Sequence, residues 1–118
     1  MFRVFKCDKC EAQIMTFEKD KLECCGKEMI ELVPNSIEAS FEKHIPTYEV
    51  VDGKVKAKVN HVMEEEHYIE WIAYVAHDIH DVRYFEPYMD AETEFTYAKD
   101  GKLYAYCNKH GLWMSEVE

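Results

Sequence analysis

The distribution of the five cysteines is the feature that most constrains this chain. Four of them crowd into the first quarter of the 118 residues: Cys7, Cys10, Cys24 and Cys25. The fifth, Cys107, stands alone near the C-terminus. A segment of about 30 residues buries too little apolar surface to fold alone, so such units usually need a metal or crosslinks. The N-terminal segment is therefore expected to fold around its four thiols.

The spacing of these four thiols is that of a metal site. Cys7-x-x-Cys10 places two thiolates on one turn. The adjacent pair Cys24-Cys25 can supply the other two if the chain bends at Gly26, because glycine accepts positive φ. A disulfide between neighbouring cysteines would close a strained ring, so shared ligation is expected. Four sulfurs suit zinc or a single iron, and the ligand type does not choose between these metals.

Composition and charge exclude several classes of function. The formal net charge of −10 at pH 7 argues against binding to nucleic acid or to an anionic membrane. No stretch approaches the ~20 apolar residues of a membrane span. The first residues lack the pattern of a signal peptide. We therefore expect a cytoplasmic protein, in which clustered cysteines stay reduced and bind metals.

After a linker at residues 33–36, the chain shows short strand patterns separated by turn residues. Asp52-Gly53 and Asp100-Gly101 have the composition of hairpin turns. Several short strands over about 80 residues indicate an antiparallel β-sandwich. Residues 63–67 are expected to form one helical turn. Strands are expected at residues 2–6, 11–17, 21–23, 47–52, 54–60, 68–76, 82–88, 92–97 and 103–107.

A second group of ligand-type side chains is spread over the sandwich segment: His44, His61, His67, Cys107 and His110. Any one of these histidines alone is more often a surface or core residue than a ligand. Taken together with a thiol, they favour a site for iron, copper or zinc. His77 and His80 are also close in sequence, but their acidic neighbours indicate a polar loop rather than a metal site.

Three segments closely resemble the signature segments of superoxide reductases: FEKHIP at 41–46, HVMEEEHYIEW at 61–71 and CNKHGLW at 107–113. The four-cysteine segment resembles the desulforedoxin domain of the two-iron members, the desulfoferrodoxins. The resemblance covers nearly the whole chain. It implies a mainly β protein, with a small metal-bound desulforedoxin-like domain at 1–36. An immunoglobulin-like antiparallel β-sandwich, the superoxide reductase (neelaredoxin-like) domain, would follow at 37–118.

The resemblance also implies an activity, namely one-electron reduction of superoxide to hydrogen peroxide without dismutation to oxygen. The catalytic ferrous iron would lie in a plane of four histidine nitrogens, with an axial sulfur and an open sixth position. Its ligands would be His44, His61, His67, His110 and Cys107. A second iron, or zinc, would occupy the four-cysteine site. Such an enzyme is an oxidoreductase of oxidative-stress defence.

Two further residues acquire roles only through the resemblance. Lys43 would attract superoxide and polarise the bound product, and Glu42 would ligate the ferric ion after turnover. Without the resemblance, both would be interpreted as solvated surface residues. Val62 and Glu66 stand where the family commonly has proline and lysine. The local positive charge is therefore reduced, and Lys43 and Lys109 would carry most of it.

The family resemblance further implies a rubredoxin-like electron donor and a homodimer. Two alternatives stay open. The chain could be a non-catalytic electron carrier that uses only the four-cysteine iron, but the histidine group would then have no role. It could also be a structural or sensing protein with zinc in both sites. Trp71 and Trp113 are expected to shield the histidine site from water.

Overall fold

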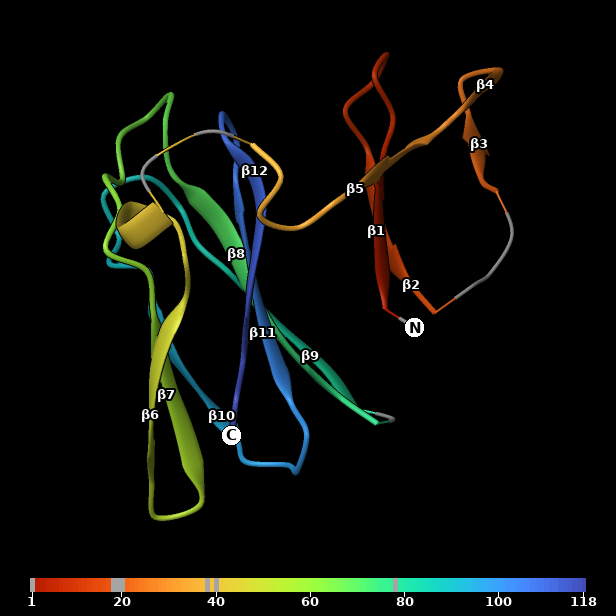
Figure 1. Ribbon diagram of the computed structural model, residues 1–118. Coiled ribbons are helices and arrows are strands. Elements are labelled where there is room, and N and C mark those ends of the chain that lie inside the picture. Colours follow the sequence, from red (N-terminus) through yellow and green to blue (C-terminus); the bar gives the residue numbers. More distant parts are fainter. Residues whose placement is uncertain (1, 18–20, 38, 40, 78) are drawn as a thin grey trace. The chain divides into compact units, whose positions relative to one another are not determined.

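The computed structural model describes residues 2–17, 21–37, 39, 41–77 and 79–118 (Figure 1). The chain divides into two compact units, Met1–Val33 and Pro34–Glu118. The division falls at the start of the segment expected to be a linker. The types of the two domains, and their bounds of 1–36 and 37–118, stay predictions. Within the described residues, no helix is long and apolar enough to cross a membrane.

The smaller unit consists of short antiparallel strands. A three-stranded sheet has the order β2-β1-β5, and two very short strands form a separate hairpin, β3-β4. Its buried cluster is small and includes Phe5, Cys7 and Met29. So small a core agrees with the expectation that the four cysteines are needed to hold the unit. The strands are β1 (Arg3–Lys6), β2 (Gln13–Thr16), β3 (Glu23–Cys24), β4 (Lys27–Glu28) and β5 (Ile30–Leu32).

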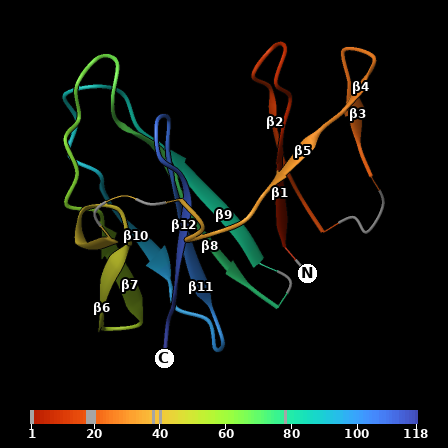
Figure 2. The same cartoon turned by 45° about the horizontal axis from the view of Figure 1, so that its top comes forward.

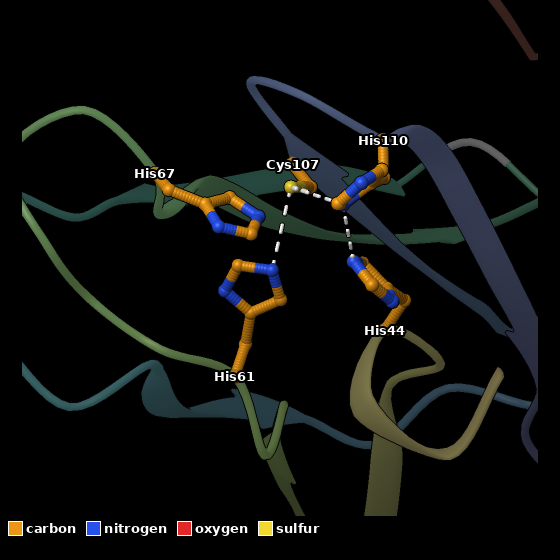
Figure 3. Close-up of side chains that lie close together, drawn as sticks. All are labelled: His44, His61, His67, Cys107 and His110. Atoms are coloured by element: carbon orange, nitrogen blue, oxygen red, sulfur yellow. Dashed lines mark hydrogen bonds between the residues drawn. The ribbon is translucent and has the colours of Figure 1, made fainter. Parts of the chain in front are cut away.

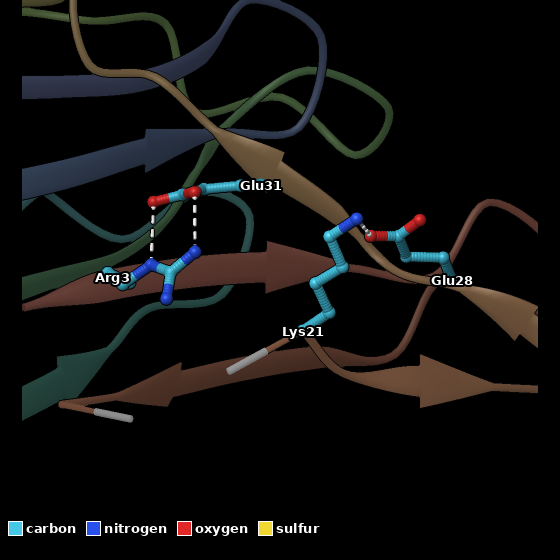
Figure 4. A network of polar contacts seen from close by, with 4 residues as sticks. All are labelled: Arg3, Lys21, Glu28 and Glu31. Atoms are coloured by element: carbon cyan, nitrogen blue, oxygen red, sulfur yellow. Dashed lines mark hydrogen bonds and ion pairs between the residues drawn. The ribbon is translucent and has the colours of Figure 1, made fainter. Parts of the chain in front are cut away.

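Ion pairs add to the smaller unit at its surface. The Arg3 guanidinium donates from Nε and one terminal nitrogen to the two carboxylate oxygens of Glu31, at 2.9 and 2.8 Å (Figure 4). This bidentate ion pair joins β1 to β5. The sequence pattern did not predict the ion pair. Lys21 and Glu28 form a second, longer pair at 3.6 Å.

The larger unit is a sandwich of two antiparallel sheets, with the strand orders β10-β7-β6 and β12-β11-β8-β9 (Figures 1 and 2). Side chains of both sheets form one core, among them Val55 and Phe95 from the first and Ile72 and Leu103 from the second. The predicted mainly β, antiparallel fold is confirmed. The elements are η1 (Phe41–Lys43), β6 (Thr47–Val51), β7 (Lys54–Lys58), β8 (Ile69–Ala76), β9 (Ile79–Tyr84), β10 (Glu92–Thr96), β11 (Lys102–Cys107) and β12 (Gly111–Glu116).

Strand β7 shows why the sequence folds in this register. Its valine and alanine, Val55 and Ala57, are buried, while the three lysines between and beside them are exposed. A one-residue slip would exchange the two faces, so the alternation fixes the pairing with β6 and β10. Asp52 and Gly53, with φ of 51° and 75°, form the hairpin turn that the sequence predicts.

The prediction of a hairpin at Asp100-Gly101 was wrong. This segment connects β10 to β11, which belong to different sheets. A glycine fits here because no side chain can be accommodated: a Cβ at Gly101 would lie 2.2 Å from the Tyr74 hydroxyl oxygen. That hydroxyl donates to the Ala98 carbonyl at 2.6 Å, which fixes the ring beneath the connection.

Other local predictions also differ from the structure. Residues 63–67 form no helical turn; Glu64 and His67 pair as an isolated antiparallel bridge. The strand expected at 82–88 runs instead over Ile79–Tyr84, so exposed His80 lies within β9 rather than in a loop. Strands β4, β5 and β12 were not predicted. Short polar strands such as β4 carry little periodic signal, so patterning misses them.

Candidate metal centres

Three segments that are distant in sequence meet at one end of the sandwich (Figure 1). They are η1, the segment 61–67 and the hairpin between β11 and β12. His44 directly follows η1, and the second segment begins with His61 and ends with His67. The hairpin carries Cys107 and His110. The structure therefore brings together all five ligand-type residues singled out in the sandwich segment.

The hairpin sets Cys107 beside His110. Cys107 pairs with Gly111 across the turn, and Gly111 has φ of 81°, which suits the left-handed end of a tight loop. The Cys107 Sγ and the His110 Nδ1 are 3.9 Å apart. A register shift between Tyr106 and Cys107 in the pairing of β11 with β8 marks a bulge. Bulges re-aim side chains near strand ends, as here toward the histidines.

The four imidazoles form a closed ring of neighbours (Figure 3). Neighbouring ring planes are steeply inclined, by 70° to 89°. Each ring therefore presents an edge rather than a face to the next, an arrangement that can direct nitrogen lone pairs to a common point. The centroid separations are 4.7 Å for His44–His61, 4.6 Å for His61–His67, 5.0 Å for His67–His110 and 4.8 Å for His110–His44.

The potential ligand atoms converge. One nitrogen from each histidine and the Cys107 sulfur all lie within 4.8 Å of one another. The sulfur is 3.4 Å from the His61 Nε2, and the His44 Nε2 is 3.0 Å from the His110 Nδ1. Among the described side chains, the His67 Nε2 is buried without a hydrogen-bond partner. An unsatisfied buried nitrogen is unfavourable, and a metal ion at the centre of this group would satisfy it.

Burial shifts the pKa values of three residues in this group, His61, His67 and Cys107. It lowers the pKa of His61 to about 4, with smaller contributions from the neighbouring histidines. It also lowers the pKa of His67, and burial raises the pKa of the Cys107 thiol. Neutral imidazole is the form that binds metals, whereas the thiol would release a proton on ligation. The His61 Nδ1 hydrogen-bonds to the Val62 carbonyl, which leaves Nε2 free to act as a ligand.

Trp113 supports two of the histidines. Its indole stacks on the His44 imidazole, with centroids 5.0 Å apart, and its Nε1–H donates to the His110 carbonyl at 3.0 Å. Trp113 is buried, so it forms part of the wall of the site. Trp71, for which a shielding role was also expected, stacks on Tyr106 at 5.9 Å and contributes to packing on its sheet.

Charged residues lie close to the histidines in the chain. Lys43 and Glu42 belong to η1, immediately before His44, and both are exposed. Lys109 is also exposed, and its positive charge further lowers the pKa of His67. The acidic run 64–66 is exposed, as expected of a solvated face. Cations and anions thus both lie near the site.

The second candidate centre is in the smaller unit. The sulfurs of Cys7, Cys10, Cys24 and Cys25 lie within 4.8 Å of one another, and all four cysteines are free. The Cys10 and Cys24 sulfurs are 3.6 Å apart, and those of Cys24 and Cys25 are 3.8 Å apart. Cys25 and Gly26 have φ of 55° and 72°, so they make the sharp bend that the sequence predicts. Lys27 donates to the Asp8 carboxylate at 2.7 Å and ties the two cysteine loops together.

The thiols of this centre differ in acidity. Backbone N–H groups of Cys10 and Lys9 lower the pKa of Cys7 to about 6. Hydrogen bonds from the Cys24 thiol to the neighbouring cysteine sulfurs raise the pKa of Cys24 to about 12, because they favour its protonated form. A cation among the four sulfurs would offset their mutual repulsion when they ionise, as in a tetrathiolate metal site.

Asn108 is a residue at the sandwich site that sequence analysis left without a role. Its side-chain oxygen accepts from the Tyr68 N–H, and its side-chain nitrogen donates to the Glu66 carbonyl. Both partners adjoin His67. Its position beside Cys107 was the only sequence signal that could have drawn attention to it.

Comparisons with known proteins agree with this architecture. The sequence profile of the desulfoferrodoxin family matches residues 36–116. The desulfoferrodoxin of Desulfarculus baarsii is 36% identical over 121 residues, which cover 97% of this chain and 95% of that protein. A superoxide reductase of Pyrococcus horikoshii is 31% identical and covers 65% of this chain and 87% of its own length. The crystal structure of the superoxide reductase from Treponema pallidum superposes with a TM-score of 0.78 at 25% identity, covering 98% of both chains.

Proposed function

The chain belongs to the desulfoferrodoxin family, and we propose that it is a superoxide reductase. The reaction is O₂•⁻ + e⁻ + 2 H⁺ → H₂O₂, so one superoxide yields one hydrogen peroxide and no oxygen. Proteins named superoxide reductase are among its relatives and structural neighbours. The proposal extends their activity to this chain.

The observation that carries the proposal is the converging group of four imidazoles and one thiol. Nitrogen and thiolate donors together suit iron, and the unpartnered His67 Nε2 fits a metal at the centre. Bound ferrous iron would supply the single electron. The imidazoles of His44, His61, His67 and His110 and the sulfur of Cys107 would hold the iron.

The side chains around the metal would control the reaction. Cys107 is fully buried, so its thiolate would be shielded from water and would donate strongly to the metal. Lys43 would draw superoxide toward a protein whose net charge of −10 otherwise repels it. It would also stabilise the negative charge that develops before protonation. Glu42 would supply a further carboxylate ligand to the metal.

We assign the four-cysteine group a second iron, or zinc, in a closed site that holds the smaller unit together and could pass electrons. This gives two metal ions per chain. The desulforedoxin-like and sandwich domain types, a rubredoxin-like electron donor, a homodimer and a cytoplasmic location belong to the same proposal. They rest on the family resemblance and on the need for reduced thiols.

The test is to load the full chain with iron(II), count the metal, and expose it to a calibrated flux of superoxide with excess reductant. We expect two iron ions per chain, two distinct visible absorption regions after oxidation, and one peroxide per superoxide without oxygen release. Oxygen release with half as much peroxide would indicate dismutation. A single iron with redox activity but no peroxide would favour the electron carrier, and a colourless zinc protein would overturn both.

A further inference from the structure

Asn108 links two of the ligand-bearing segments by three hydrogen bonds. Its Oδ1 accepts from the Tyr68 backbone N–H at 3.0 Å, and its Nδ2 donates to the Glu66 carbonyl at 2.9 Å. Its own backbone N–H donates to the Tyr68 carbonyl at 3.2 Å. The bond from the Tyr68 N–H is partly buried, whereas the bond to the Glu66 carbonyl is exposed to water.

The placement of these bonds relative to the ligands is specific. Asn108 directly follows Cys107, and its partners Glu66 and Tyr68 stand immediately before and after His67. The Asn108 side chain therefore bonds to the backbone on both sides of His67, and Asn108 is itself the residue next to Cys107. The His67 segment is closed on its other side by two backbone bonds to Glu64, at 2.9 and 3.2 Å. The backbone around His67 is thus restrained both by Asn108 and by Glu64.

The chemistry of the amide explains why asparagine suits this position. Its donor and acceptor lie in one plane at a fixed separation, so a single side chain satisfies one N–H and one carbonyl. Aspartate could accept from Tyr68 but would place a negative oxygen against the Glu66 carbonyl. Partners that orient metal ligands in this way tune the affinity and the electronic properties of the metal.

We propose that Asn108 is a positioning residue that fixes the distance between the Cys107 sulfur and the His67 imidazole. It thereby tunes the sulfur–metal interaction at the sandwich centre. The inference rests on the proposed function, because it needs a metal held by these two residues.

The chain contains a matched control for this proposal. Asn35 also pairs its side-chain amide with a strand backbone in the larger unit, accepting from the Met114 N–H at 2.9 Å and donating to the Met114 carbonyl at 3.1 Å. Met114 is not next to any of the five ligand-type residues. Asn35→Asp therefore makes the same chemical change at a backbone clamp that adjoins none of the five ligand-type residues; the neighbour of Met114 in the chain is Trp113, in the wall of the site.

The experiment compares Asn108→Asp and Asn35→Asp in the full, iron-loaded chain. The readouts are iron(II) affinity of the sandwich centre by chelator competition, its sulfur-to-iron absorption maximum and its reduction potential. The four-cysteine absorption serves as an internal reference. For Asn108→Asp we expect iron affinity to fall about 10–100-fold, with a shifted absorption band and potential. For Asn35→Asp we expect a lower melting temperature, with changes in the band, the potential and the affinity that are much smaller than those of Asn108→Asp, because Met114 adjoins Trp113 and not a ligand.

Equal effects of the two substitutions on the sandwich centre, or no effect of Asn108→Asp, would overturn the positioning role. If Asn108→Asp does not fold, Asn108→Gln, which keeps the amide but displaces it, is judged by the same readouts. Absence of a sulfur-to-iron band from the sandwich centre of the wild-type protein would instead contradict the proposed function. The two failures are therefore distinguishable.

Discussion

Trp113 and His44 are stacked, with ring centroids 5.0 Å apart and ring planes inclined by 25°. The same indole donates to the His110 carbonyl, so one buried side chain contacts residues from both the η1 end and the β11–β12 hairpin. These two segments carry their ligands from opposite ends of the larger unit's sequence. The packing of Trp113 in the sandwich therefore affects the positions of His44 and His110 in the candidate metal site.

We predict that Trp113→Ala destabilises the metal-free protein by about 3–5 kcal/mol, because it leaves a cavity in a buried wall. Trp113→Phe should cost less, since it keeps the stacked ring and loses mainly the hydrogen bond. Urea unfolding followed by circular dichroism measures both. Trp71→Phe is the control, because it alters a buried indole that stacks on Tyr106. In the iron-loaded protein, Trp113→Phe should also change the absorption of the sandwich centre, and an equal change for Trp71→Phe would contradict a specific role of Trp113.

The residue types made it possible to predict the two groups of potential metal ligands. The contacts between residues distant in sequence could not be predicted in this way. Thiols and imidazoles are visible in any sequence, and their spacing together with the family resemblance indicated which would gather. The role of Asn108 depends on Tyr68, which is 40 residues away and carries no matching local pattern. Gly101 was likewise interpreted as a turn glycine, but a side chain is excluded there because the Tyr74 ring occupies the space.

Strand prediction succeeded where burial alternates along the strand and failed where it does not. β7 alternates lysine with buried Val55 and Ala57, so its register and turn follow from the sequence. β9 was misplaced because its exposure pattern is irregular, with Ile79 and Tyr84 both exposed. The helical turn expected at 63–67 is instead a tight turn closed by the bridge between Glu64 and His67, and these few residues carry no pattern that separates the two kinds of turn.

The two cysteine-containing centres should be separable by mutation, because they belong to different compact units. Cys10→Ser is expected to remove the four-cysteine absorption and to weaken the smaller unit while peroxide formation continues. Cys107→Ser should do the reverse. Metal content, visible spectra and peroxide yield on the two variants measure this. Loss of both centres in Cys10→Ser would show that the sandwich site depends on the smaller unit.

Lys43→Ala should slow the reaction with superoxide about tenfold while leaving the iron content unchanged, because it removes a cation beside the proposed site. Pulse radiolysis at several salt concentrations measures the second-order rate, and the variant should be less sensitive to salt. Lys54→Ala makes the same charge change at an exposed residue where the β6–β7 hairpin turns, and this hairpin turn lies at the end of the sandwich opposite the candidate site (Figure 1). A rate for Lys43→Ala equal to that for Lys54→Ala would remove the steering role.

The pair of Arg3 and Glu31 predicts a pH dependence for the smaller unit (Figure 4). Hydrogen bonding to Arg3 holds the pKa of Glu31 below its usual range in the folded state. The unfolded chain therefore binds a proton more readily, so the contribution is present above about pH 4 and is lost as the pH falls further. Because the pair is partly exposed, we expect less than about 1 kcal/mol.

The measurement is the difference in urea midpoint between wild type and Glu31→Gln at pH 7 and pH 3.5, followed at the four-cysteine absorption. The difference should shrink on acidification. Glu28→Gln is the control and should have a smaller effect at pH 7, since its pair with Lys21 is longer, at 3.6 Å. A difference that grows as the pH falls would contradict the sign derived for Glu31.

Gly111 and Gly53 offer a test of how tightly the ligand hairpin is packed. Both have positive φ, 81° and 75°, so alanine at either site meets backbone strain of about 1–2 kcal/mol. A Cβ at Gly111 would also lie 2.8 Å from the Ile37 Cδ1, whereas a Cβ at Gly53 would have no atom within 4 Å. Gly111→Ala should therefore destabilise the larger unit slightly more than Gly53→Ala, because the end of the half-exposed Ile37 side chain must move aside. Tryptophan fluorescence during urea unfolding reports this unit, because both tryptophans lie in it.

The excess destabilisation of Gly111→Ala should disappear when Ile37→Ala is present, because the clash is then relieved. Ile37 is half-exposed, so Ile37→Ala alone should change the free energy of unfolding little. The double-mutant cycle isolates the contact from the shared backbone strain. Equal losses for Gly111→Ala with and without Ile37→Ala would mean that strain alone acts at Gly111, and that Ile37 does not constrain the turn that carries His110.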